Sequence, residues 1–306
     1  MQMSDWEAER GILDRDSAKE GAADLISRVC PTLERLVNMG TVVVAHSHMS
    51  RRSSERPAFP IIASYLHAVD MVDGVHTLLS EAVAWQTIPL ARSAFEALLA
   101  IDYLTTHDSD RRCAAWWVSY HNSAVRRIKR LDRRTEQGKQ FLKAVQSDKT
   151  FAGWGEMDTT KIDLFYSQSE VARQHPDLRE AFAEYERTEN GGRRPPWYAL
   201  FAGPRTIADL ARHLNREAQY DALYRRWSDI VHPNDLTRYI VPGSGPDPLM
   251  TPLRDPKIFL DVAFHTAMIL CDASARLAVW FGFDSQMVNR LNATSELCHQ
   301  ELRQAS

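Results

Sequence analysis

Cysteine is scarce in this sequence, and the few cysteines are widely spaced. The 306 residues include four, and no two of them form a C-x-x-C pair. A zinc knuckle or a disulfide framework needs cysteines at short, regular spacings, so we expect neither. Reduced thiols are typical of a cytoplasmic protein, which is the location we predict. The four cysteines are Cys30, Cys113, Cys271 and Cys298.

Long apolar runs and a surplus of positive charge are also missing. The opening MQMSDWEAERGILDRD is acidic and polar, unlike a signal peptide. The most apolar region, PLARSAFEALLAIDYL, is interrupted by Arg92 and Glu96, so we expect no membrane span. The chain has 37 Lys and Arg against 40 Asp and Glu. That balance excludes a uniformly basic nucleic-acid binder but leaves room for a local basic surface.

Several motifs of known chemistry are lacking too. There is no Gly-rich phosphate loop, nucleophile elbow or kinase motif. His67, Asp70, Asp73 and His76 step by three, but helical rotation puts the two histidines about 180° apart. A di-iron site needs two E-x-x-H motifs, and the chain has one, at Glu296. We therefore predict no metal site and no cofactor.

What the sequence does have is helical periodicity over most of its length. A break is expected at Pro31, and TVVVA at 41–45 is the only strand-like run, too short to build a sheet. The pattern predicts an all-α helical bundle in a single helical domain, residues 1–306. We expect N-terminal helices and a connector in 1–57, the bundle core in 58–134 and 204–303, and a less regular peripheral insertion in 135–203.

The stretch YRRWSDIVHP, residues 224–233, concentrates reactive side chains at the end of one helix. At 100° per residue, Arg225 and His232 lie two turns apart on the polar side, with Ser228 between them. Arg226 falls at the edge of the apolar side. The closing proline should end the helix at or just before His232. The imidazole then sits at the negative end of the helix dipole, which favours its protonated form.

These residue types suit phosphodiester chemistry without a metal. A histidine near neutrality can move the proton of a ribose hydroxyl or of the leaving oxygen, and an arginine can stabilise charge on phosphate oxygens. We therefore predict Arg225, His232 and Ser228 as catalytic residues. A structural alternative stays open, in which Arg225 pairs with Asp221 or Asp229 and His232 simply caps the helix.

A charged pair interrupts the otherwise apolar helix of residues 88–104. Arg92, Glu96 and Tyr103 share one stripe of that helix. Because a helix that is apolar all round is normally buried, we expect Arg92 and Glu96 to form an internal ion pair. The pair either fixes how the helices pack or supports the site of Arg225 and His232, with Tyr103 as a further donor.

A basic run, VRRIKRLDRR, occupies residues 125–134. Aromatic side chains precede it on the same predicted helix, so this helix can contact RNA phosphates and stack bases. The alternative is an ordinary solvated helix face. The predicted RNA-binding residues are Arg126, Arg127, Arg130 and Arg133, with Trp116, Trp117, Tyr120 and His121 upstream.

The Arg-x6-His spacing at a helix end resembles the R-x(4–6)-H signature of the HEPN superfamily. Those are α-helical proteins, many of them metal-independent endoribonucleases in toxin–antitoxin and antiviral systems. The resemblance implies a HEPN-like bundle, RNA as substrate and a homodimer whose two motifs face each other. It also implies an antitoxin or defence protein as a partner.

A longer resemblance involves RSAFEALLAIDYL (92–104) and YDALYRRWSDIVHP (220–233). They are similar to the pattern R-S-x-[FL]-E-A with a downstream Y-x3-Y-R-x-x-S-x3-H, found in a family of uncharacterised bacterial proteins, domain of unknown function 5677. That match is expected over 60–290 and aligns Arg225 with the motif arginine. Two functions follow as hypotheses. One is a HEPN-like endoribonuclease acting as a toxin or antiphage effector. The other is a non-catalytic helical module that binds a partner protein, nucleic acid or small ligand in a polar pocket.

Overall fold

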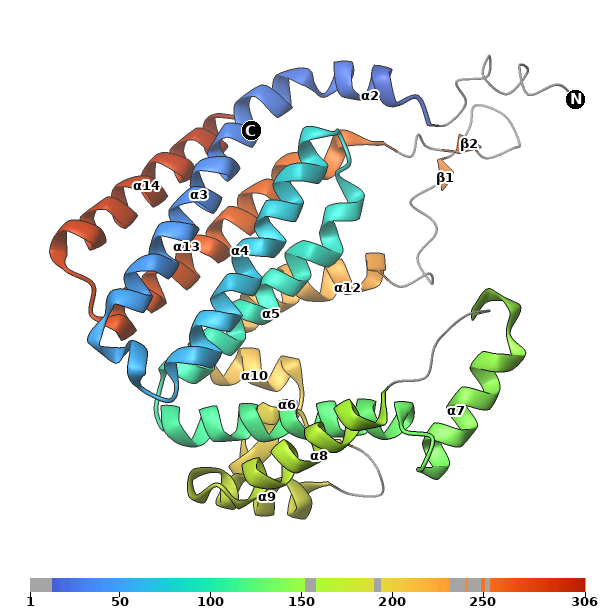
Figure 1. The fold of residues 1–306 in the computed structure, drawn as a ribbon. Coiled ribbons are helices and arrows are strands. Elements are labelled where there is room, and N and C mark those ends of the chain that lie inside the picture. The colour runs from blue at the N-terminus through green and yellow to red at the C-terminus, as the bar shows by residue number, and fades with distance from the viewer. Residues whose placement is uncertain are drawn as a thin grey trace, which may run out of the picture. The chain divides into compact units, whose positions relative to one another are not determined.

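The computed structural model describes residues 13–151, 158–189, 194–231, 240–241, 249–250 and 254–305. It confirms the all-α class (Figure 1). Among the described residues, extended pairing is confined to two short antiparallel strands, β1 (Ile240–Val241) and β2 (Leu249–Met250). The chain divides into two compact units. The first is made of two segments, the described residues up to His107 and those from Ala211 onward, and the second spans Asp108–Leu210.

The first unit is a bundle built around helix α13 (Phe259–Phe281). This helix lies against α3 (Ala23–Met49), α4 (Ala58–Ser80), α5 (Ile88–Thr105) and α14 (Ser285–Gln304), as Figure 1 shows. Most of its residues are buried, and each large apolar side chain so buried stabilises the fold by about 1.5–3 kcal/mol. Shorter elements complete the unit: α2 (Arg15–Gly21), η1 (Arg51–Ser54), η2 (Trp85–Thr87), α11 (Glu217–Gln219), η5 (Tyr220–Arg225), α12 (Arg226–Val231) and η7 (Pro256–Ile258).

One stretch of this core, Pro256–Phe281, is long and apolar enough to cross a membrane by length and composition. The expectation that no apolar run approaches such a length does not hold for it. Most of the stretch is buried inside the bundle, as is usual for the central helix of a helical core. A single helix of this kind is weak evidence for a membrane span.

Helix α3 corrects two expectations about the N-terminal region. It continues through Pro31 as far as Met49, so the break expected at the proline is absent and the strand-like run at 41–45 lies within the helix. The break between helices falls at Ala22 instead. The strand-like run is helical because tertiary packing overrides β-branched propensity. A Cβ added at Gly40 would lie 2.8 Å from Val69 of α4, so this glycine permits close helix packing.

The second unit contains α6 (Ser109–Leu131), α7 (Glu136–Ser147), α8 (Thr159–Gln174) and α9 (Pro176–Thr188), with the short turns η3 (Lys149–Phe151) and η4 (Trp197–Ala202). The division falls within α10 (Ile207–His213). Helix α6 was expected in the bundle core, but it packs against α7, α8, α9 and η4. The segment expected as a peripheral insertion therefore shares a core with α6. That core includes Ala114, Ala115, Val118, Ala181, Phe182, Tyr185 and Leu200.

Candidate functional site

The helical segment that carries Arg225 and Ser228 runs from Glu217 to Val231 and is called the motif helix below. It contains a π-helical turn, η5, between α11 and α12. A π turn bonds residue i to residue i+5 and so holds one residue more than an α turn. Tyr224 is only 6% exposed and lies with Leu223 and Trp227 on the buried side of this helix. Its ring stacks on Tyr220 with the centroids 5.2 Å apart.

Tyr224 closes a polar cluster with the two charged residues of α5. Nη2 of Arg92 donates to the Tyr224 hydroxyl at 2.6 Å, and that hydroxyl donates to Oε1 of Glu96 at 2.7 Å. Arg92 and Glu96 do pair, with Nε of Arg92 3.5 Å from Oε1 of Glu96, but the pair is not internal as expected, because the Glu96 side chain is 45% exposed. The Arg92 guanidinium also lies over the Tyr224 ring, 4.4 Å from its centroid. The cluster therefore fastens the π turn to α5.

Electrostatics keep the Tyr224 hydroxyl protonated. Burial raises its pKa to about 12, helped by the hydrogen bond to Glu96 and opposed by the one from Arg92. At neutral pH the phenol is therefore a hydrogen-bond donor to Glu96 rather than a proton-transfer group. Sequence reasoning did not single out Tyr224 as a site residue, although it is the second tyrosine of the quoted Y-x3-Y-R pattern.

Arg225 points the opposite way from its neighbour. Its side chain is 67% exposed, and its Nη2 lies 3.4 Å from Oδ1 of Asp221, one turn earlier. The guanidinium lies 5.9 Å from the centroid of the Tyr220 ring. Arg225 and Asp221 thus form the ion pair that is expected if the motif is structural and not catalytic. Ser228 is half-buried, and His232 lies outside the described residues.

Tyr103 lies about two turns beyond Glu96 on α5, and its ring packs edge-on against His213 at 5.7 Å. Asp102, next to Tyr103, is only 1% exposed. It is more deeply buried than Arg92 and Glu96, the other charged residues on this helix. It pairs with Arg216 and with Nε of Arg276, the latter at 2.9 Å. Arg216 precedes α11, so this network holds the start of the motif helix against the bundle. The only hint in the sequence was an aspartate inside an apolar helix.

The structure separates the four predicted RNA-binding cations. Arg126 turns inward, where its guanidinium donates to Tyr185 at 3.0 Å and to Ser123 at 3.1 Å. Arg127 and Arg130 are exposed on α6, and Arg133 is exposed just after the helix ends. Position 126 therefore anchors α6 to α9 and does not belong to the outer surface.

An aromatic pair lies on the same face of α6 as Arg127 and Arg130. The rings of Trp116 and Tyr120 stack with 5° between their planes and 5.7 Å between their centroids. Tyr120 is 53% exposed. At helical spacing, Trp116, Tyr120, Arg127 and Arg130 fall within about 80° of one another around the helix. This aromatic and basic face is the part of the second unit best suited to single-stranded nucleic acid.

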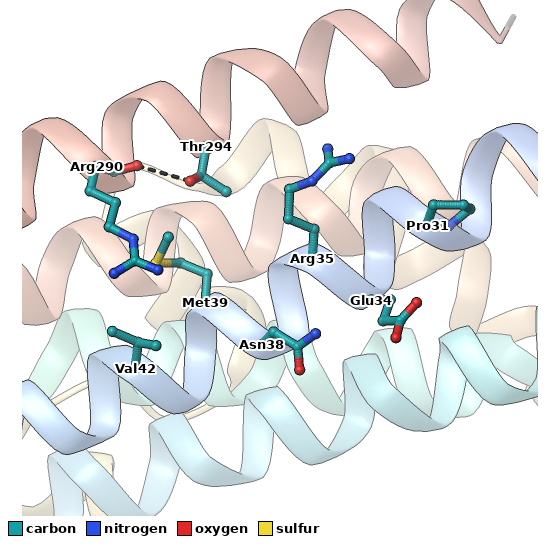
Figure 2. A pocket seen from close by; sticks show the side chains of 8 residues that line it. All are labelled: Pro31, Glu34, Arg35, Asn38, Met39, Val42, Arg290 and Thr294. Atoms are coloured by element: carbon teal, nitrogen blue, oxygen red, sulfur yellow. Dashed lines mark hydrogen bonds between the residues drawn. The ribbon is translucent and has the colours of Figure 1, made fainter.

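A surface groove of about 440 Å³ lies elsewhere in the first unit, between α3 and α14 (Figure 2). Arg35 and Arg290 extend into it from the two helices. Arg35 is bound to Glu301 at 2.7 Å, which also accepts from Thr32. None of the predicted site residues lines this groove. Within the described ranges, no group of three or more His, Cys, Asp or Glu side chains is arranged to hold a metal ion.

The chain matches a known protein family. Residues 58–246 match a family of unknown function, DUF5677. The match contains Arg92, Glu96 and the whole motif helix and ends before α13. A search of the curated proteins and a search of the solved structures each gave no match. Since the match spans more than half of the chain, the protein belongs to the DUF5677 family of unknown function.

Proposed function

We propose that this protein is a HEPN-like, metal-independent endoribonuclease that acts as a homodimer, as a toxin or antiphage effector. The observation that carries the proposal is the exposure of Arg225. Tyr224 is buried and the next side chain, Arg225, extends into solvent, seven residues before His232. A guanidinium presented in this way can reach a phosphate, and its exposed partner Asp221 can be displaced because surface ion pairs contribute little.

In this reaction the ribose 2′-hydroxyl attacks the adjacent phosphorus and the 5′-oxygen leaves. His232 accepts the proton of the attacking hydroxyl or supplies one to the leaving oxygen. Arg225 stabilises the negative charge that builds on the phosphate oxygens. Ser228 orients the reacting groups. Arg92 and Glu96 act through Tyr224, because together they fix the turn that presents Arg225.

The outer face of α6 supplies RNA contact in this proposal. Tyr120 offers a ring on which a base can stack, and Arg127 and Arg130 offer charges for phosphates. Arg126 does not take part, because its two terminal nitrogens donate to Tyr185 and Ser123 and its side chain is turned inward.

A second function has its own supporting observation. Arg92, Glu96 and Tyr224 satisfy one another, and Arg225 has an ion pair within its own helix. This self-contained arrangement suits a non-catalytic module in which the charges hold helices together. Such a module would bind a partner protein, nucleic acid or small ligand.

The two functions separate in an RNA-cleavage assay of the wild type beside His232→Ala. The endoribonuclease loses about 10²–10⁴-fold in cleavage rate when its general acid or base is removed. Expression of His232→Ala should also be less toxic to cell growth than expression of the wild type. The circular dichroism spectrum and the thermal unfolding of the variant should stay as in the wild type. Equal cleavage by a folded His232→Ala protein contradicts the proposal.

A further inference from the structure

The groove between α3 and α14 brings two arginines from different helices to one space. Its volume is about 440 Å³, within the range of about 300–1,000 Å³ that is usual for small-ligand sites. Arg35 extends into it from α3 and Arg290 from α14, as Figure 2 shows. Both helices belong to the first unit. The endoribonuclease proposal uses none of the residues that line this groove.

Arg35 is held in place by a carboxylate. Its Nη1 donates to Oε2 of Glu301 at 2.7 Å, and the hydroxyl of Thr32 donates to the same oxygen at 2.6 Å. Glu301 is not among the residues that line the groove, whereas Arg35 is. An arginine carries five N–H donors, so donors of Arg35 remain for a ligand. The guanidinium is therefore oriented from outside the groove and can donate into it.

Arg290 forms no ion pair within the described part of the chain. The residue is exposed, and Figure 2 shows its side chain reaching toward Met39 of α3. The hydroxyl of Thr294 donates to the backbone carbonyl of Arg290 at 2.9 Å, so this hydroxyl is not left to donate to a ligand. Arginine is not deprotonated in proteins. The two positive charges of the groove therefore do not depend on a titration.

The rest of the lining is apolar along the groove and acidic toward one end. Pro31, Met39 and Val42 offer apolar surface, and covering such surface with an apolar ligand is favourable. Glu34 lies near Pro31, away from Arg290 (Figure 2). Its carboxylate repels a second anionic group on the same ligand. The lining therefore suits a molecule with one anionic group and an apolar body.

We infer that the groove binds a small organic anion, with a single phosphate or carboxylate group held between Arg35 and Arg290. A planar guanidinium offers paired donors that match either kind of oxyanion. Arg35 is oriented in advance, and the long side chain of Arg290 reaches the same anion from the opposite helix. The amide of Asn38, which also lines the groove, adds a neutral donor. Binding here requires neither Arg225 nor His232.

The test is a titration of the full-length protein, isotope-labelled at its arginine nitrogens, followed by NMR of the Nε–Hε signals. The two signals are assigned from their loss in Arg35→Lys and in Arg290→Ala. The probes are phenyl phosphate, benzoate and inorganic phosphate. We expect an organic probe to shift both signals saturably and to bind about tenfold more tightly than inorganic phosphate. Binding should be about tenfold weaker in Arg290→Ala. Tighter binding of phenyl phosphate identifies a phosphate ester, and tighter binding of benzoate identifies a carboxylate.

The matched control is Arg303→Ala, because Arg303 is another exposed arginine of α14 and does not line the groove. It should bind the probes as the wild type does. Glu34→Gln removes the opposing negative charge, so it should bind them no more weakly than the wild type. Three results overturn the inference: neither organic probe shifts the two signals, inorganic phosphate binds as tightly as both organic probes, or Arg290→Ala weakens binding no more than Arg303→Ala does.

Discussion

The hydroxyl of Tyr224 lies 2.7 Å from Oε1 of Glu96, a residue 128 positions earlier in the chain. This contact joins the π turn to α5, and Arg92 completes it from the other side of the phenol oxygen. With Tyr224 held on the buried side, its successor Arg225 faces solvent. The presentation of the motif arginine therefore depends on an aromatic residue that is not itself placed in the proposed chemistry.

Tyr224→Phe should lower the free energy of unfolding by about 2 kcal/mol. The change removes one hydroxyl that both accepts and donates a hydrogen bond, and bonds to charged partners contribute about 1.5–3 kcal/mol each. The loss stays below the sum of two such bonds because Arg92 and Glu96 keep their ion pair and Glu96 is 45% exposed. Urea unfolding measures the effect. Tyr220→Phe is the control, since the contact described for Tyr220 is ring stacking, and it should change stability by a few tenths of a kcal/mol. Equal losses in the two variants would remove the case for the Glu96 contact.

Asp102→Asn should be among the most destabilising single changes in the first unit. Asp102 is 1% exposed and pairs with both Arg216 and Arg276, and removing one partner of a buried ion pair costs about 3–5 kcal/mol. Asp272→Asn removes a 38% exposed partner of the same Arg216 and should cost about 1 kcal/mol or less. Thermal unfolding of the two variants side by side checks the difference. Similar melting temperatures would show that burial of Asp102 is not the deciding factor.

The stability that His265 contributes should depend on pH. Its folded pKa is raised above the ordinary 6.5 by Asp261, so the folded state binds this proton more tightly than the unfolded state does. The contribution is fully present below about pH 6.5 and is lost as the pH rises through the folded pKa. The gap in unfolding free energy between wild type and His265→Asn should therefore be larger at pH 6 than at pH 9. A gap that widens toward pH 9 would contradict the ion pair between His265 and Asp261.

Single-stranded RNA binding should depend on one side of α6. Arg127→Ala and Arg130→Ala should each weaken binding of a fluorescent oligouridylate and reduce the salt slope by about 0.7. Tyr120→Ala should cost about 1–3 kcal/mol of binding free energy through lost stacking. Lys129→Ala is the matched control, since Lys129 is exposed about 160° around the helix from Arg127. Loss of affinity in Lys129→Ala equal to that in Arg127→Ala would show that no single face is used.

The fold was predictable where apolar periodicity is long and regular, as in α4, α5 and α13. Prediction failed in α3, because a run of valines and a proline suggested local breaks that packing against α4 and α13 overrides. In the site, the outward position of Arg225 and the pairing of Arg92 with Glu96 were foreseen, but the exposure of Glu96 was not. The contacts of Tyr224 were missed because its partners lie on α5, far away in the sequence, and no spacing rule joins them.

The sequence also could not show which arginines of the basic run, residues 125–134, face solvent and which turn inward. Arg126 and Arg127 are neighbours of identical chemistry, and only the position of Tyr185 on another helix decides that Arg126 turns inward. The contact between Arg226 and Asp261 was missed for the same reason. The two residues come from helices separated along the chain, and no spacing rule joins them.

The most direct measurement is the single-turnover rate of RNA cleavage in EDTA for the wild type, Arg225→Ala and Asp221→Ala. If Arg225 stabilises the transition state, Arg225→Ala should cleave about 10²–10³-fold more slowly. Asp221→Ala removes the ion pair but keeps the guanidinium, so it should cleave at nearly the wild-type rate. The opposite result is no cleavage by the wild type, or equal rates for Arg225→Ala and the wild type. Either would show that the exposed arginine is not part of a ribonuclease site.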